Sequence, residues 1–342
     1  MYYMWTENLN LNDLREMDAV VRNVMNKFRA KYALQLNSIL YVPRVLGGRG
    51  LKNFEITYKQ IKVKSALNLL EVTDQRMKEV CKFDQHRAKA NRSAIVADAV
   101  EYAINDFGIT LTPTSEGFVC VYEVENEELS TSSKQVAMSQ IKTRAVGKLY
   151  DEVIASTWQG AIFKMRKTDD QLMGSYCFAW LTKWKDCPVQ VINDIHSVYL
   201  QTVPTLSFLR GRSATVINSD TCRLCKHGKE TVKHILSNCD TLARTDYLLR
   251  HNRALQIIIF RVLKQLSFID KVPPWYSPVT IKPFYENDHG KVYWDIPEYS
   301  GAEDDEVEER VFRPDAKIVF QKEKKIVVVE MSVPWIESRS DK

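Results

Sequence analysis

The sequence predicts a mostly helical α+β protein with a small metal-binding module and a β-containing C-terminal region. Three observations support this prediction. Apolar residues recur at spacings of three and four over several long stretches, which is the period of an amphipathic helix. Two short runs rich in β-branched residues follow near the C-terminus. Between these regions, three cysteines and one histidine lie close together in the chain.

Composition excludes several classes of protein. The chain has 342 residues, enough for two or three domains of roughly 150 residues each. Its net charge of +5 permits a nucleic-acid partner without requiring one. No apolar run approaches the roughly 20 residues of a membrane span, and the N-terminus lacks the apolar core of a signal peptide. We therefore expect a nuclear or cytoplasmic protein that is neither secreted nor membrane-bound, with reduced cysteines.

The first half of the chain is predicted to be largely helical. Apolar spacing predicts a long helix over residues 12–34, after which the proline and glycines of residues 43–50 break the chain. A second helix is predicted over Ile56–Leu70. Residues 74–150 have a mixed pattern, in which the polar stretch Glu125–Lys134 is predicted to be a loop.

The second half alternates helical and irregular patterns. A small tryptophan-rich helical region is predicted at residues 148–185, and an amphipathic helix from Leu255 to Ile269. Four prolines between residues 273 and 283 predict an interdomain segment. The acidic run at residues 303–309 is typical of a solvated loop.

The strongest chemical signal is the pattern Cys222-x2-Cys225-x8-His234-x4-Cys239. Zinc takes four thiolate or imidazole ligands in a tetrahedron, and two cysteines separated by two residues can offer both sulfurs to one ion from a single turn. Four protein ligands leave no position for a catalytic water, so the spacing predicts a structural or nucleic-acid-binding zinc site. The alternative is a chance cluster of buried cysteines.

Basic residues are concentrated around this pattern. Between Arg210 and Arg253 there are nine basic residues and only four acidic ones. Such a zone can contact phosphates, although it can equally be a solvated basic face. The candidates for nucleic-acid contacts are Arg210, Arg212, Arg223, Lys226, Lys229 and Lys233.

A second signal is a predicted hairpin near the C-terminus, with strands at Ala316–Phe320 and Ile326–Val333. A turn centred on Lys322-Glu323 would place Asp315 directly opposite Glu330, close enough for both carboxylates to share a divalent ion. This is the layout of a PD-(D/E)xK nuclease core, in which Mg²⁺ activates water.

The hairpin departs from that nuclease pattern at one position. Ser332 occupies the place of the lysine, and Lys317, on the same strand face as Asp315, is the only plausible substitute. The alternative is an ordinary hairpin with acidic residues at its edge. Other catalytic signatures are absent, since the sequence has no P-loop, no H-E-x-x-H and no aspartate pair on an apolar strand.

The order of these motifs resembles the C-terminal part of the Pol protein of non-LTR (LINE-type) retrotransposons with a restriction-like endonuclease. The segments Asp18–Arg22 and Leu40–Leu51 are similar to the thumb that follows the reverse-transcriptase palm, with a looser likeness around His196–Pro204. The cysteine–histidine pattern, followed by Leu242, Tyr247, Arg250 and His251, is similar to the family's CCHC motif. The segments Arg313–Asp315 and Val329–Trp335 are similar to the start of its endonuclease.

The resemblance implies zinc as a cofactor, possible magnesium, and target DNA and element RNA as partners. It divides the chain into a thumb-like helical region (1–75), a helical linker (76–215), the CCHC zinc knuckle with its following helix (216–270) and an incomplete endonuclease-like α/β region (271–342). Because the palm is absent and the nuclease core would continue beyond Lys342, we expect a fragment that binds DNA or RNA with the help of zinc. The alternatives are a Mg²⁺-dependent endonuclease that nicks target DNA and an inert product.

Overall fold

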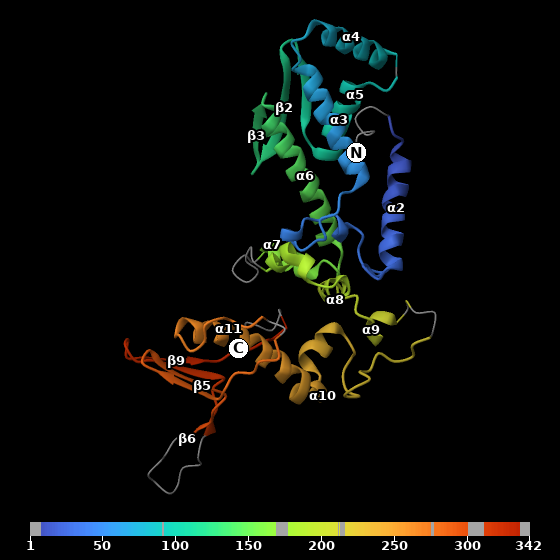
Figure 1. Ribbon diagram of the computed structural model, residues 1–342. Helices are drawn as coiled ribbons and strands as arrows, with labels where there is room; N and C mark the ends of the chain where they lie inside the picture. Colours follow the sequence, from blue (N-terminus) through green and yellow to red (C-terminus); the bar gives the residue numbers. More distant parts are fainter. Residues whose placement is uncertain are drawn as a thin grey trace. The chain divides into compact units, whose positions relative to one another are not determined.

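The computed structural model describes residues 8–90, 92–168, 177–210, 212, 216–274, 277–299 and 311–335. It confirms the α+β class, with about half of the chain helical (Figure 1). Two compact units, Met1–Val203 and Pro204–Lys342, each have their own core. The predicted acidic loop at residues 303–309 lies outside the described residues. Among those residues, no helix combines the length and apolar character that crossing a membrane would need.

The first unit consists of helices and one small sheet. Its helices and strands are α2 (Leu11–Lys27), α3 (Phe54–Leu70), α4 (Gln75–Lys89), α5 (Ile95–Phe107), β1 (Thr110–Thr114), β2 (Gly117–Val124), β3 (Glu127–Thr131), α6 (Lys134–Ala155), α7 (Ala161–Thr168) and α8 (Val189–Tyr199). Short 3₁₀ turns lie at Ser38–Leu40, Arg44–Leu46 and Ala179–Asp186.

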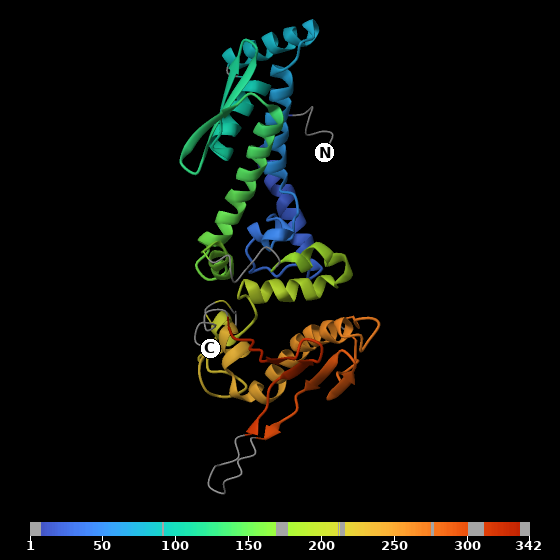
Figure 2. The same cartoon turned by 90° about the vertical axis from the view of Figure 1, so that its left-hand side faces the viewer.

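The core of this unit lies between three helices and the antiparallel sheet β1-β2-β3 (Figure 2). Alternate residues of β2, Phe118, Cys120 and Tyr122, are buried against side chains of α3, α5 and α6. Helix α3 belongs to the predicted thumb-like region, whereas α5 and α6 belong to the predicted linker. The two predicted regions therefore share one core.

Two predicted boundaries in this unit were wrong. The helix predicted over residues 12–34 ends at Lys27, because Arg29 adopts a left-handed conformation (φ 53°) that stops the helical hydrogen bonding. Half of the loop predicted at Glu125–Lys134 is strand β3 (Glu127–Thr131), which pairs with β2. Its side chains are mostly exposed, so it shows no alternation of apolar and polar residues.

The glycine-rich segment that the sequence places after the first helix is fixed by close packing. Gly47 has a φ of 93°, which favours glycine, and a Cβ on Gly48 would lie 2.0 Å from the carbonyl oxygen of Val42. His196 of α8 brings its Nε2 to 2.9 Å from the oxygen of Gly47. Burial lowers the pKa of His196. The contact joins two segments that the sequence analysis associated only by resemblance.

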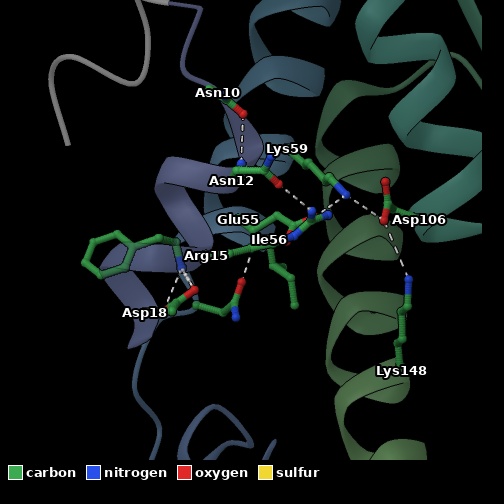
Figure 3. A network of polar contacts seen from close by, with 11 residues as sticks. Asn10, Asn12, Arg15, Asp18, Glu55, Ile56, Lys59, Asp106 and Lys148 are labelled. Carbon is green, nitrogen blue, oxygen red and sulfur yellow. Dashed lines mark hydrogen bonds and ion pairs between the residues drawn. The ribbon is translucent and has the colours of Figure 1, made fainter. Parts of the chain in front are cut away.

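Charged side chains connect four helices of this unit (Figure 3). The carboxylate of Glu55 in α3 forms ion pairs with Arg15 of α2, whose Nε lies 2.7 Å away, and with Lys59, whose Nζ lies 2.8 Å away. Lys59 also lies 2.9 Å from Asp106 of α5, and Lys148 of α6 lies 3.6 Å from the same carboxylate. Burial lowers the pKa of Lys59, but the two carboxylates outweigh this effect and raise it above its ordinary value. The network therefore keeps a nearly buried ammonium charged.

The second unit contains the cysteine–histidine segment, one long helix and an antiparallel sheet. Its elements are α9 (Leu206–Leu209), a π-helical turn (His234–Asn238), α10 (Asp240–Leu242), a second π-helical turn (Ala243–Tyr247), α11 (Leu248–Gln265), β4 (Phe284–Asn287), β5 (Gly290–Trp294), β6 (Glu298–Tyr299), β7 (Val311–Phe312), β8 (Ala316–Phe320) and β9 (Lys325–Val329).

Helix α11 covers one face of the sheet β4-β5-β8-β9 (Figure 1). Leu255, Ile259 and Leu263 of α11 pack against Val292 and Ile318. Leu255 and Ile259 of the predicted amphipathic stripe therefore face the sheet, whereas Ile258 is 49% exposed, and the helix ends at Gln265 rather than Ile269. The sheet is antiparallel throughout rather than the expected α/β arrangement.

The predicted C-terminal hairpin is present with the expected register. Ala316 pairs with Val329, and Phe320 pairs with Lys325. The next positions outward are Asp315 and Glu330, so the prediction that they oppose each other agrees with the ladder. The second strand is shorter than predicted and ends at Val329.

Candidate metal centre

Four predicted ligands meet in the second unit. The ligand atoms of Cys222, Cys225, His234 and Cys239 all lie within 4.8 Å of one another. The sulfurs of Cys222 and Cys239 are 4.0 Å apart, and Nε2 of His234 lies 3.3 Å from the sulfur of Cys225. Ligands of a tetrahedral zinc ion are separated by about 3.5–3.8 Å, given bonds of roughly 2.0–2.3 Å. These four side chains, hereafter the metal centre, can hold a metal ion.

The backbone between the first two ligands forms a tight turn. The N–H of Lys226 donates to the carbonyl of Cys222, and the N–H of Cys222 donates to the carbonyl of Gly228, each at 3.0 Å. Lys226 and Gly228 both adopt left-handed conformations, with φ of 61° and 53°. The N–H of His227 points at the sulfur of Cys225, 3.4 Å away. This turn presents both sulfurs on one side, as the x2 spacing predicts.

The hydrogen bonds of the turn also affect the thiols. Burial raises the pKa of Cys222, but hydrogen bonds from the backbone of Cys225 and Leu224 outweigh it and bring the pKa down to about 7. Burial and the neighbouring Cys222 and Cys239 instead raise the pKa of Cys225. Because the thiolate is the metal ligand, the lowered pKa of Cys222 favours the form that binds a metal ion.

The hydroxyl of Tyr247 connects the two C-terminal ligands. It accepts a hydrogen bond from the N–H of Cys239 at 2.9 Å. It also lies 3.1 Å from the carbonyl of His234 and 2.9 Å from that of Ile235. These backbone groups belong to the π-helical turn and to the residue that follows it. Tyr247 therefore orients the backbone around both ligands, a role that spacing alone did not indicate.

Arg223, one of the residues predicted to contact phosphate, is paired with a carboxylate of the protein itself. The guanidinium of Arg223 forms a bidentate pair with Glu230, with Nη2–Oε1 at 2.6 Å and Nε–Oε2 at 3.0 Å. Glu230 is only 2% exposed and also accepts the backbone N–H groups of Arg223 and Leu206. Burial raises the pKa of Glu230, but these contacts outweigh it and lower the pKa. Glu230 lies within the segment that resembles the CCHC motif, but its pairing with Arg223 was not predicted from the sequence.

The other candidate basic residues differ in their surroundings. Lys226 and Lys229 are exposed on the turn of the metal centre. Arg210 lies 3.6 Å from Asp220, and Nη1 of Arg212 donates to the carbonyl of Phe208 at 2.9 Å. Lys233 is half-buried. The two lysines of the turn therefore present their charge most directly to solvent.

The predicted magnesium ligands have different environments. Oδ2 of Asp315 lies 3.1 Å from Nε2 of His251 and accepts the N–H of Met331 at 2.7 Å. Glu330 is exposed, and Lys317 extends over the ring of Tyr293, with Nζ 5.8 Å from its centre. Lys317 thus packs on the neighbouring strand, to which it is paired.

Contacts with Asp315 also affect His251. Burial lowers its pKa, but Asn252, the carbonyl of Met331 and Asp315 together raise it above its ordinary value. The imidazole therefore favours its protonated form more than a free histidine does.

Comparison with known proteins identifies no relative. No protein-family model matches the chain, and a search of curated proteins finds no match either.

Proposed function

We propose that the chain binds DNA or RNA through a basic surface that a zinc ion holds in place. The observation that carries this proposal is the meeting of three thiols and one imidazole within 4.8 Å, in a segment that has nine basic and only four acidic residues. Zinc fits best, because it prefers thiolate and imidazole ligands in a closed tetrahedral site, whereas magnesium prefers oxygen. The ion would stabilise the turn that carries Lys226 and Lys229.

We further propose that the chain is related to the C-terminal part of the Pol protein of non-LTR retrotransposons. The order of its motifs supports this relation. Contacts between motif residues are consistent with it, since Nη1 of Arg22 lies 3.0 Å from the hydroxyl of Tyr41 and His196 contacts Gly47. The ligands would then be element RNA and target DNA.

Salt-dependent binding tests the nucleic-acid proposal. Phosphate contacts release counterions, so affinity for a labelled oligonucleotide should fall steeply between about 50 and 200 mM salt. Replacing both Lys226 and Lys229 with glutamine should weaken binding about tenfold. It should also lower the salt slope, which is the slope of the logarithm of affinity against the logarithm of salt concentration, by about two in magnitude. The control is the double replacement of Lys322 and Lys325, which removes the same charge from the hairpin. Binding that is independent of salt, or equal losses in both double variants, would contradict the proposal.

A Mg²⁺-dependent endonuclease is the second candidate function. The hairpin register favours it, because Asp315 and Glu330 occupy facing positions just beyond the ladder. Two features argue against it. Ser332 offers no positive charge, and Lys317 is engaged with Tyr293. We therefore rank nucleic-acid binding first.

A further inference from the structure

A cavity of about 350 Å³ lies in the second unit, outside the four ligands of the metal centre. Its lining residues come from three segments: Ser237 and Asn238 at the end of the first π-helical turn, Tyr247, Arg250 and His251 around the start of α11, and Met331 to Trp335 after β9. None of the six basic residues selected from the sequence is among its lining residues. The cavity is therefore a candidate site separate from the surface proposed above.

Arg250 gives this cavity a fixed positive charge. Its Nη1 donates to the carbonyl of Leu236 at 2.6 Å, its Nη2 donates to the carbonyl of Val333 at 3.2 Å, and the guanidinium lies 5.1 Å from the centre of the Tyr247 ring. Its Nε is buried without a hydrogen-bond partner in the structure. Within the described residues no carboxylate pairs with Arg250, so its charge is not neutralised there.

The other lining groups suit a nucleotide. The hydroxyls of Ser237 and Ser332 and the amide of Asn238 can donate hydrogen bonds to an anion, and no lining residue is acidic. The indole of Trp335 adds an aromatic surface on which a base can stack. An unpaired cation beside neutral donors and an aromatic ring is the combination that binds phosphate and base together.

We propose that this cavity binds one nucleotide of a single-stranded nucleic acid, with its phosphate at Arg250 and its base on Trp335. The strand is single because a paired base cannot leave its stack to contact the indole without the cost of unpairing. This inference rests on the proposed function and adds a second contact to it.

Ser332 provides the sharpest test, because it is exposed and makes no contact on which folding depends in the described structure. Binding of a labelled 12-nucleotide single-stranded DNA would be measured by fluorescence anisotropy at about 50 mM salt. Ser332→Asp places a negative charge in the cavity and should weaken binding about tenfold more than the neutral Ser332→Asn, whose side chain has a similar shape. Equal affinity of both variants would overturn the proposal.

Arg250 and Trp335 are tested alongside. Because Arg250 also bridges two backbone carbonyls, Arg250→Gln is compared with Arg253→Gln, an exposed arginine on the same helix, and thermal melting is recorded for both. Arg250→Gln should lower the salt slope by about one, and Trp335→Ala should weaken binding without changing that slope. A change in melting without any change in the salt slope would show that Arg250 is only a structural bridge.

Competition experiments distinguish binding of a nucleotide from binding of phosphate alone. Adenosine monophosphate should displace the oligonucleotide from the cavity at lower concentration than inorganic phosphate does. Equal potency of the two would refute the role of Trp335. If the parent protein binds no oligonucleotide at low salt, the proposed function itself fails. If the Lys226 and Lys229 variant loses affinity while Ser332→Asp does not, only the cavity proposal fails.

Discussion

Nε2 of His251 lies 3.1 Å from Oδ2 of Asp315, so helix α11 holds the carboxylate that the sequence assigns to a magnesium site. The same oxygen accepts the N–H of Met331 at 2.7 Å. A carboxylate oxygen has two lone pairs, and these two contacts use both. Only Oδ1 remains for a cation, which weakens Asp315 as a metal ligand.

This relationship predicts that the protein does not nick supercoiled plasmid in Mg²⁺ or Mn²⁺. Catalysis needs an oriented water and a cation near the developing charge, whereas Ser332 is neutral and Lys317 lies over Tyr293. Agarose electrophoresis of plasmid DNA measures the outcome. Nicking by the parent protein that disappears in Asp315→Ala would refute this prediction and favour the endonuclease.

The metal centre predicts about one zinc ion per chain. Replacing Cys222 and Cys225 together with serine removes two ligands, so elemental analysis of the purified variant should find no zinc above background. Structural zinc contributes on the order of 10–16 kcal/mol to small modules, so the second unit should also lose protection against proteolysis. Cys81→Ser is the control, because this thiol lies in α4 and donates to the carbonyl of Leu69. Unchanged zinc content in the double variant would exclude the centre.

Tyr247→Phe should weaken the metal centre without removing a ligand. Loss of the hydroxyl leaves the N–H of Cys239 and two carbonyls with one partner fewer, at a cost of about 1–3 kcal/mol. Because the hydroxyl orients the backbone of two ligands, zinc affinity should fall about tenfold or more. Competition with a zinc chelator measures it. Tyr293→Phe is the control, and the idea fails if both variants release zinc at the same chelator concentration.

Lys31 predicts a pH-dependent stability of the first unit. It is 2% exposed, and burial, with a smaller effect of Arg22, lowers its pKa from 10.5 to about 8. Between these values the unfolded chain binds a proton that the folded chain does not, so stability rises with pH. Below pH 8 Lys31 is protonated in both the folded and the unfolded state. Burial of the charged ammonium then lowers the free energy of unfolding by its full amount, about 1–3 kcal/mol.

Lys31→Met removes this titration. The variant should therefore be more stable than the parent at pH 7, and the difference should shrink towards pH 10.5. Urea unfolding at several pH values measures both proteins. A difference that is constant over this pH range would show that the charge of Lys31 does not carry the effect.

The sequence by itself determined features that depend on local spacing. The x2 spacing of Cys222 and Cys225 dictates a tight turn that presents two sulfurs, and the four-residue spacing of Leu255, Ile259 and Leu263 places them together on the buried face of α11. The register of the hairpin also follows locally, because a turn of fixed length sets which residues pair. These features need only the chain on either side of them.

The tertiary structure alone decided which polar groups neutralise one another. Arg223 and Lys226 are equivalent basic residues in the sequence, yet one is paired with buried Glu230 while the other faces solvent. Likewise, Asp315 meets His251, 64 residues away, and Arg250 bridges segments that lie far apart in the chain. Charges separated this widely in sequence come into contact only when packing brings their elements together, because electrostatic interaction depends on distance in space and on burial.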